Sequence, residues 1–257
     1  MRGGKILIRL DDVWKTYKMG KSTVEALRGL SLDINEGDFL VIMGPSGSGK
    51  STAMHVIGCL DIPTKGKLLL EGQNIAHLTE SELANIRGRK MGFIFQQFNL
   101  IQTLTASENV ELPMIFQGIP KKEREKKALE LLKAVGLKDR AKHKPTEMSG
   151  GEQQRIAIAR ALVNDPKIIL ADEPTGNLDS KTGRMVMQTL IDLHNEQNKT
   201  IVIVTHDPAI ASYAERTVNL VDGRIAHDHE TASRYLWKNG KPKKGYKSDN
   251  KIRRFDG

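Results

Sequence analysis

One eight-residue segment constrains this chain more than any other, because it fits the pattern G-x-x-x-x-G-K-[ST]. Before it lies a continuous apolar run at residues 39–43, which is typical of a strand buried on both faces. After it, residues 52–60 have the spacing of a helix. Strand, glycine loop and helix in this order predict a phosphate-binding loop. The segment consists of Gly44, Pro45, Ser46, Gly47, Ser48, Gly49, Lys50 and Ser51.

The residue types in this loop suit the binding of a phosphate chain. Its glycines permit backbone conformations that are closed to other residues, so the chain can wrap an anion closely. Backbone N–H groups at the start of the following helix would then face the anion. We expect Lys50 to reach the β- and γ-phosphates and the hydroxyl of Ser51 to bind Mg²⁺.

Polar residues follow three other apolar runs, at the points where the predicted strands end. They are Gln96, the pair Asp172 and Glu173, and His206. The carboxyl ends of parallel strands meet at one edge of a sheet, so these groups favour one shared site. Asp172 can hold Mg²⁺, and Glu173 is placed to activate a water as a general base. Gln96 could orient water or bind a metal, and His206 could donate to a phosphate, although each alone is more often a structural or surface residue.

Between residues 98 and 150 the pattern becomes helical and more charged, which predicts a helical insertion in an α/β core. The segment Met148-Ser149-Gly150-Gly151-Glu152-Gln153 then leads into another apolar-faced helix. Ser149 is a plausible N-cap, and the two glycines leave backbone N–H groups open for a second anion. A capped helix start with a flexible turn explains the same residues almost as well.

The N-terminal and C-terminal parts of the sequence have hydrophobic patterns that differ from those of the segments between them. Residues 5–35 alternate as antiparallel strands do, and Tyr17 in the first strand could either stack on a base or be half-buried. Residues 217–225 predict a closing hairpin. We therefore expect one folded domain at 5–230, with its helical subdomain at about 98–150, and a basic, mobile tail at 231–257.

Charge and composition exclude several classes of protein. The net charge is +9, and residues 238–257 account for +6 of it with eight bases and two acids, so no nucleic-acid partner is expected. The single cysteine fits a reducing compartment. No apolar run approaches the ~20 residues of a membrane span, and the first residues lack the pattern of a secretory signal. A cytoplasmic protein is expected.

Taken together, these motifs resemble the ATP-binding subunits of ABC transporters over roughly residues 5–228. The loop resembles Walker A, Phe95-Gln96 the Q-loop, and residues 168–173 Walker B with the catalytic glutamate. MSGGEQ at 148–153 resembles the LSGGQ signature, with Met for Leu and Glu for Gln. Residues 176–179 resemble the D-loop, His206 the H-loop, and Tyr17 the adenine-stacking aromatic residue.

The resemblance implies a fold and a set of site residues. The fold is α/β, with a P-loop NTPase (RecA-like) parallel-sheet core, an N-terminal antiparallel β-subdomain and an inserted helical subdomain. Catalysis is assigned to Glu173, His206, Gln96 and Lys50, and the Mg²⁺ ligands to Ser51, Gln96 and Asp172. Binding of ATP is assigned to Tyr17, Gly44, Pro45, Ser46, Gly47, Ser48, Gly49, Lys50, Ser51, Thr52, Gln96, Ser149, Gly150, Gly151, Asp172, Asp179 and His206.

The resemblance also implies partners and a mode of action. ATP on Lys50 and Ser51 of one subunit would be completed by Ser149 and Gly151 of a second in a homodimer, and segment 98–150 would dock a transmembrane permease subunit. Finer details, such as FQQFNL at 95–100 and ADEPTGNLDS at 171–180, are similar to the branch serving lipoprotein release and macrolide or peptide export. An ATPase that drives a membrane partner mechanically, as in cell division, remains the alternative. The protein would lie on the inner face of the cell membrane, and its basic tail could contact anionic lipid.

Overall fold

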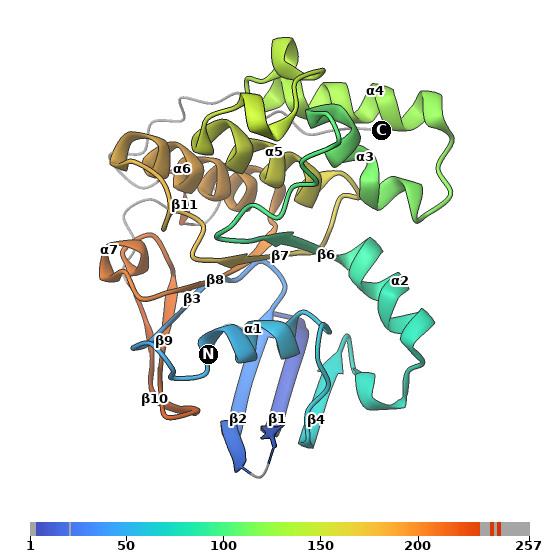
Figure 1. Ribbon diagram of the computed structural model, residues 1–257. Coiled ribbons are helices and arrows are strands. Elements are labelled where there is room, and N and C mark those ends of the chain that lie inside the picture. The colour runs from blue at the N-terminus through green and yellow to red at the C-terminus, as the bar shows by residue number, and fades with distance from the viewer. Residues whose placement is uncertain (1–3, 21, 232–236, 239–240, 243–257) are drawn as a thin grey trace.

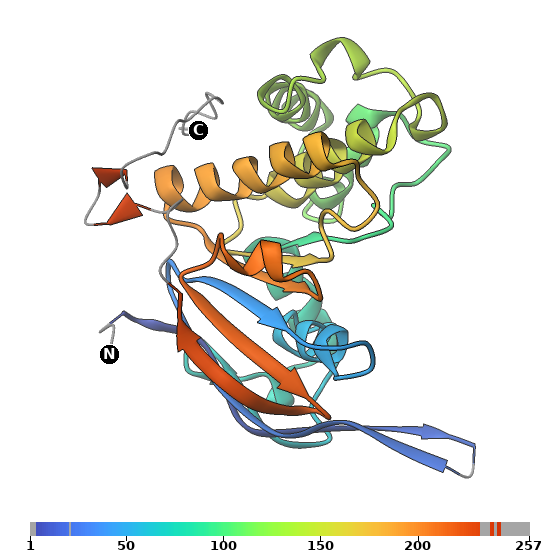
Figure 2. The same cartoon turned by 90° about the vertical axis from the view of Figure 1, so that its left-hand side faces the viewer.

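The computed structural model describes residues 4–20, 22–231, 237–238 and 241–242 (Figures 1 and 2). A six-stranded sheet runs through its centre in the order β10-β9-β3-β8-β7-β6. Neighbours from β9 to β6 are parallel, and β10 is antiparallel to β9. The strands are β3 (Phe39–Met43), β6 (Met91–Ile94), β7 (Ile168–Asp172), β8 (Thr200–Thr205), β9 (Arg216–Val221) and β10 (Arg224–Glu230).

Both faces of this central sheet are covered, which explains the continuous apolar runs of its inner strands. Along β3, Phe39 and Val41 pack into one hydrophobic core, while Leu40 and Ile42 pack into another. The first core is shared with the helices drawn above the sheet in Figure 1, and the second with α1 (Lys50–Ile57) and a smaller sheet drawn below it. A strand with two buried faces needs apolar residues at every position.

The smaller sheet is antiparallel and has the order β2-β1-β4-β5, as the N-terminal alternation predicts. In Figure 2 the paired ends of β1 and β2 project beyond the rest of the molecule. Register shifts interrupt the β1–β2 ladder at several points, and such bulges bend and twist a strand pair. The strands are β1 (Ile6–Met19), β2 (Ser22–Asn35), β4 (Lys65–Leu70) and β5 (Gln73–Asn74).

Three of the remaining helices begin at capping boxes. Thr79, Thr105 and Ser149 each accept a hydrogen bond from the backbone three residues on, and a glutamate at that position bonds back to the cap. These capping boxes satisfy N–H groups that a helix start leaves unpaired. The helices are α2 (Glu80–Lys90), α3 (Ala106–Ile115), α4 (Lys121–Ala134), α5 (Gly150–Leu162), α6 (Ser180–Gln197) and α7 (Pro208–Ala211).

The structure confirms the α/β class and refines several boundaries. The helix predicted at 52–60 begins at Lys50 and ends at Ile57. The segment 98–150, predicted to be a helical insertion, holds α3 and α4 and two 3₁₀ turns, Lys138–Arg140 and Pro145–Glu147. The sequence did not predict α6, because the first turns of this helix are polar and its buried residues lie mainly further along.

The predicted basic tail falls mostly outside the described residues, as does its predicted contact with anionic lipid. Two short strands, β11 (Trp237–Lys238) and β12 (Lys241–Pro242), are described there and pair with each other. Throughout the described ranges, no helix combines the length and the apolar character that crossing a bilayer requires.

Candidate functional site

Four strands of the central sheet deliver functional groups to one edge. β3 leads into the glycine loop, β6 into Gln96, β7 into Asp172 and Glu173, and β8 into His206. These groups line one cavity of about 680 Å³. This is expected, because the carboxyl ends of parallel strands meet at one edge of the sheet. Its lining is Val24, Glu25, Ala26, Pro45, Ser46, Gly47, Gly49, Lys50, Ser51, Thr52, Gln96, Asp172, Glu173 and His206.

The glycine loop has a backbone that only glycine adopts without strain. Gly47 and Gly49 have φ angles of +79° and +97°, in the left-handed region. A Cβ on Gly49 would lie 2.4 Å from the carbonyl oxygen of Ala26, whereas the space around Gly47 is open. Lys50, only 9% exposed, turns its Nζ onto the carbonyl oxygen of Pro45 at 2.8 Å. The loop is thus a concave cradle with a buried ammonium beside it, which fits a chain of phosphates.

Oxygen donors gather where the cradle meets β7. Burial raises the pKa of Asp172 and the nearby Glu173 carboxylate adds to this effect, while a hydrogen bond with Ser51 opposes it. Ser51, Gln96 and Asp172, whose side chains all carry oxygen atoms, line the same cavity. Mg²⁺ prefers hard oxygen ligands, and a cation would relieve the cost of ionising a half-buried carboxyl group. The residues present therefore fit a magnesium ion.

Glu173 is held in place by the end of β8. Its Oε2 accepts a hydrogen bond from Thr205 Oγ1 at 2.9 Å, and its Oε1 accepts one from the backbone N–H of His206 at 3.1 Å. The Nδ1 of His206 lies 2.6 Å from the same Oε1. Glu173 also has a left-handed φ of +45°, which is uncommon for a non-glycine residue. Such strain is often found at functional sites, and here it fixes one carboxylate toward the cavity.

Gln96 is tied to the segment that follows Glu173. Its backbone oxygen accepts a hydrogen bond from Asn177 Nδ2 at 2.9 Å. A Cβ on Gly176 would lie 3.0 Å from Gln96 Nε2, so the two segments are in close contact. Movement at the end of β6 would therefore reach residues 176–179 directly.

The predicted signature residues lie outside the cavity lining. Ser149 caps α5 through Glu152, and Gly151 packs so close to Thr182 that a Cβ would lie 2.5 Å from its Cγ2. Thr182 in turn donates to Asp179, which caps α6. Ser149, Gly150, Gly151 and Asp179 therefore form a second group, separate from the Lys50 cavity within one chain.

Tyr17 lies beside the cavity without lining it. It is paired on the β-ladder with Val24, which does line it. Burial, and then a hydrogen bond to Asp61, raises the pKa of the Tyr17 phenol. Gly44 and Ser48 belong to the loop but also fall outside the lining.

Four residues that shape the site are not among those predicted from the sequence. Val24, Glu25 and Ala26 line the cavity from β2, and Thr205 holds Glu173. The signal was weak, because residues 24–26 show only an interrupted alternation. Thr205 could have been noticed as the last residue of a strand that ends at His206.

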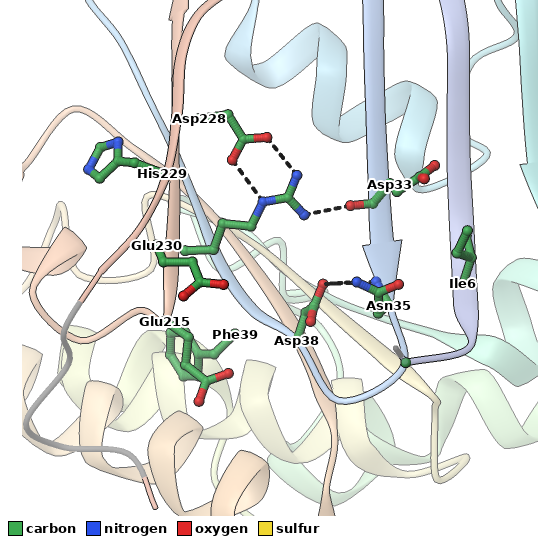
Figure 3. A pocket seen from close by; sticks show the side chains of 11 residues that line it. Ile6, Asp33, Asn35, Asp38, Phe39, Glu215, Asp228, His229 and Glu230 are labelled. Atoms are coloured by element: carbon green, nitrogen blue, oxygen red, sulfur yellow. Dashed lines mark hydrogen bonds and ion pairs between the residues drawn. The ribbon is translucent and has the colours of Figure 1, made fainter. Parts of the chain in front are cut away.

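A second cavity, of about 710 Å³, lies at the opposite edge of the sheet, where β3 and β9 begin (Figure 3). Arg216 is among its lining residues and forms two hydrogen bonds with Asp228, at 2.8 and 2.6 Å, and a third with the backbone oxygen of Asp33. Asp38 accepts from the backbone of Asn35. These groups link the edge of the large sheet to β2.

The fold and the carboxyl-edge cavity define a nucleotide-binding protein of the P-loop NTPase class. The chain matches the family profile described as "ABC transporter" over residues 27–176. It is 55% identical over 221 residues to an uncharacterized ABC transporter ATP-binding protein of Thermotoga maritima, covering 86% of this chain and 94% of that one. This chain belongs to the ABC transporter family, as one of its ATP-binding, ATP-hydrolysing proteins.

Two further relatives bear on activity and assembly. The macrolide export ATP-binding/permease protein MacB of Brucella abortus is 52% identical over 225 residues, which are 88% of this chain but 35% of that larger protein. The ATP-binding cassette MJ0796 of Methanocaldococcus jannaschii was solved as a dimer in a post-hydrolysis state with ADP and Pi. That structure has a TM-score of 0.81 and 52% identity, covering 87% of this chain and 98% of the other.

Proposed function

We propose that this protein energises export or extraction of a substrate, such as a lipoprotein, peptide or drug, through a separate permease subunit. The observation that carries the ATPase part is the single cavity at the carboxyl edge, with Glu173 fixed beside oxygen donors for Mg²⁺. The similarity to a macrolide exporter favours export over the purely mechanical, cell-division type of partner. We also propose 5–230 as the ATP-binding domain, with 98–150 as its helical subdomain.

In the proposed mechanism the glycine loop and Lys50 hold the β- and γ-phosphates of ATP. Ser51, Gln96 and Asp172 would hold Mg²⁺, which would neutralise charge on the phosphates. Glu173 accepts the proton of the attacking water, and His206 keeps its carboxylate in position through the 2.6 Å contact. Attack in line with the leaving ADP oxygen breaks the bond to the γ-phosphate and releases Pi.

A second copy of the chain completes each site. Ser149, Gly150 and Gly151 at the start of α5, with Asp179, would face the γ-phosphate bound by the partner copy. The separation of this group from the Lys50 cavity within one chain supports such a head-to-tail homodimer. The N-terminus of α5 would then direct backbone dipoles at the developing negative charge.

A groove of about 730 Å³ supports the docking of a permease helix. It lies between α2, α3 and the end of β6, and it includes Phe95, the residue before Gln96. Phe116 on its rim is 86% exposed, and Leu60 is 44% exposed. A groove lined with apolar residues beside Gln96 suits an amphipathic helix and would pass its movement to the magnesium site. This partner would hold the protein on the inner face of the cell membrane.

The change of Glu173 to Gln tests the catalytic assignment. The amide retains the shape of the side chain but cannot accept a proton, so turnover should fall about 10²–10⁴-fold while ATP still binds. An ATP-bound dimer should then accumulate in size-exclusion chromatography with light scattering. Lys50→Ala is the matched control, which should lose ATP binding and stay monomeric. A Glu173→Gln protein that remains monomeric in saturating ATP would contradict the proposed homodimer.

The nature of the membrane partner needs a separate experiment. Tagged Glu173→Gln protein would be captured with ATP from detergent-solubilised host membranes, and the co-purifying proteins identified by mass spectrometry. A stoichiometric multi-span protein with a large extracytoplasmic domain supports export or extraction. Ribosomal or DNA-associated proteins without a membrane partner would overturn the transport proposal and leave the ATPase assignment intact.

A further inference from the structure

A network of charged groups holds Tyr17 in a way that none of the recognised motifs requires. The Tyr17 hydroxyl donates to Asp61 Oδ2 at 2.9 Å. Lys15 forms an ion pair with Oδ1 of the same carboxylate, and its Nζ lies over the Tyr17 ring, 5.1 Å from the centroid. The phenol is therefore held at its hydroxyl and contacted by a cation on one face of its ring.

Asp61 is itself attached to the helix that begins at the phosphate loop. α1 starts at Lys50, and the backbone N–H groups of Leu60 and Asp61 both donate to the carbonyl oxygen of His55 in its last turn, at 2.9 and 3.2 Å. The Asp61 side chain also accepts from the backbone N–H of Ile62 at 2.8 Å. The carboxylate thus has a fixed place relative to the loop that binds phosphates.

The network supplies three hydrogen-bond donors to an ionised Asp61 carboxylate, from Lys15, Tyr17 and the Ile62 backbone. Burial alone would raise the pKa of Asp61, but hydrogen bonds from Lys15, Tyr17 and the Ile62 backbone together lower it. Lys15 has a second acceptor in the carbonyl oxygen of Ile62, at 2.9 Å. Its side chain is only 13% exposed, so the pair is shielded from solvent more than an ordinary surface ion pair.

We propose that Asp61 is a positioning residue for the nucleotide base. With Lys15, it fixes the Tyr17 ring in the orientation on which a purine base stacks, at a set place relative to the phosphate loop. This inference rests on the proposed role of Tyr17 in stacking on the base. Stacking on an aromatic ring contributes substantially to binding, and a ring fixed in advance loses less conformational freedom when the base arrives. Val24, opposite Tyr17 on the ladder, lines the ATP cavity and places the ring at its border.

The test compares a ligand that carries a base with one that does not. Calorimetry would measure dissociation constants for ADP and for pyrophosphate, both with Mg²⁺, in Asp61→Asn, Tyr17→Phe and the double variant. Each single variant should weaken ADP binding about threefold to tenfold and leave pyrophosphate unchanged, and the double variant should be no weaker than either. In steady-state assays KM for ATP should rise while kcat is retained.

Controls separate this inference from the proposed role of Tyr17. Asp33→Asn removes another carboxylate paired with β1, through Arg9, and should leave both ligands unaffected. If Tyr17→Ala weakens ADP binding but Asp61→Asn and Tyr17→Phe do not, Asp61 has no positioning role although the stacking role stands. If Tyr17→Ala also leaves ADP binding unchanged, the stacking role fails. Equal weakening of ADP and pyrophosphate by Asp61→Asn would assign Asp61 to the phosphate loop instead. Tyr17→Phe removes the same bond should Asp61→Asn fail to fold.

Discussion

At several positions in this protein, the surrounding space limits the residue type as much as the required chemistry does. Gly49 shows both constraints, because its φ is +97° and a Cβ would lie 2.4 Å from the carbonyl oxygen of Ala26. Glu173 shows a different compromise, since it keeps a left-handed φ of +45° and its carboxylate has three polar contacts, one with Thr205 and two with His206. The rigid backbone around both residues is what lets them present N–H groups and a carboxylate in fixed directions.

The substitution Gly49→Ala should separate backbone strain from collision. It should lower the free energy of unfolding by about 2–4 kcal/mol, because the left-handed φ and the clash with Ala26 both act. Gly72→Ala is the matched control, since its φ of +84° is similar but no atom lies within 4 Å, and it should cost about 1 kcal/mol. Urea unfolding measures both values. Equal losses in the two variants would show that the clash with β2 is relieved without cost.

At the scale of elements, ion pairs connect sheets and helices that are distant in the sequence. Glu71, in the turn between β4 and β5, accepts from Lys90 at the end of α2 and from Lys167 before β7. Arg216, at the start of β9, links β9 and β10 to β2. These pairs join elements that are far apart in the sequence.

The Glu71 pairs predict a dependence of stability on pH. The hydrogen bond from Lys167, followed by that from Lys90, lowers the pKa of Glu71 from 4.5 to about 2. A lowered pKa contributes stability that is present above pH 4.5 and is lost as the pH falls toward 2. Glu71→Gln should therefore be less stable than the parent by about 1–2 kcal/mol at pH 7, with allowance for solvent screening, and equal to it near pH 2.

Urea unfolding across this pH range checks the Glu71 prediction. Glu80→Gln is the control, because Glu80 is 82% exposed and lies 4.0 Å from Arg87, so it should change little at any pH. A difference between Glu71→Gln and the parent that is the same at pH 7 and pH 2 would assign the loss to packing instead of charge.

Elements with a strong local signal could be predicted from the sequence. The strands at 39–43, 168–172 and 200–205 are buried on both faces, so their apolar runs are continuous, and the capping boxes at Thr79, Thr105 and Ser149 mark three helix starts. α6 was not predicted, although its buried residues are numerous, because its first turns are polar.

The candidate site could be predicted only in part, for a related reason. Strand-end residues such as Gln96 and His206 can be recognised in the sequence because each follows an apolar run. Val24, Glu25 and Ala26 reach the cavity because β1 and β2 fold back over the loop, and Asp61 reaches Tyr17 across 44 positions. Contacts of this kind depend on tertiary placement, and no local pattern encodes them.

At the scale of the whole molecule, we propose two surfaces among the described residues as sites for partners. One holds the start of α5 with Ser149, and the other is the apolar groove beside Phe95. An exposed apolar patch of this kind often marks an interaction site.

The groove can be tested through Phe116. Because this side chain is 86% exposed, Phe116→Ser should leave the stability and basal ATPase rate of the isolated protein nearly unchanged. Co-purification with the membrane partner should fall at least about tenfold, since a loss of about 1.4 kcal/mol of binding produces that change. Leu129→Ser on α4 is the control, as it is 42% exposed and lies outside the groove lining. Equal co-purification of both variants would exclude the groove as the docking surface.

The separation of Ser149 from the Lys50 cavity has a consequence for how the enzyme's rate is measured. If each complete site needs parts from two molecules, then turnover per molecule is not a constant of the protein. It should fall on dilution even when every cavity is filled with ATP, and it should be restored wherever subunits are held close together. A permease that holds two copies side by side would then raise their effective concentration. The free protein in dilute solution would hydrolyse little ATP.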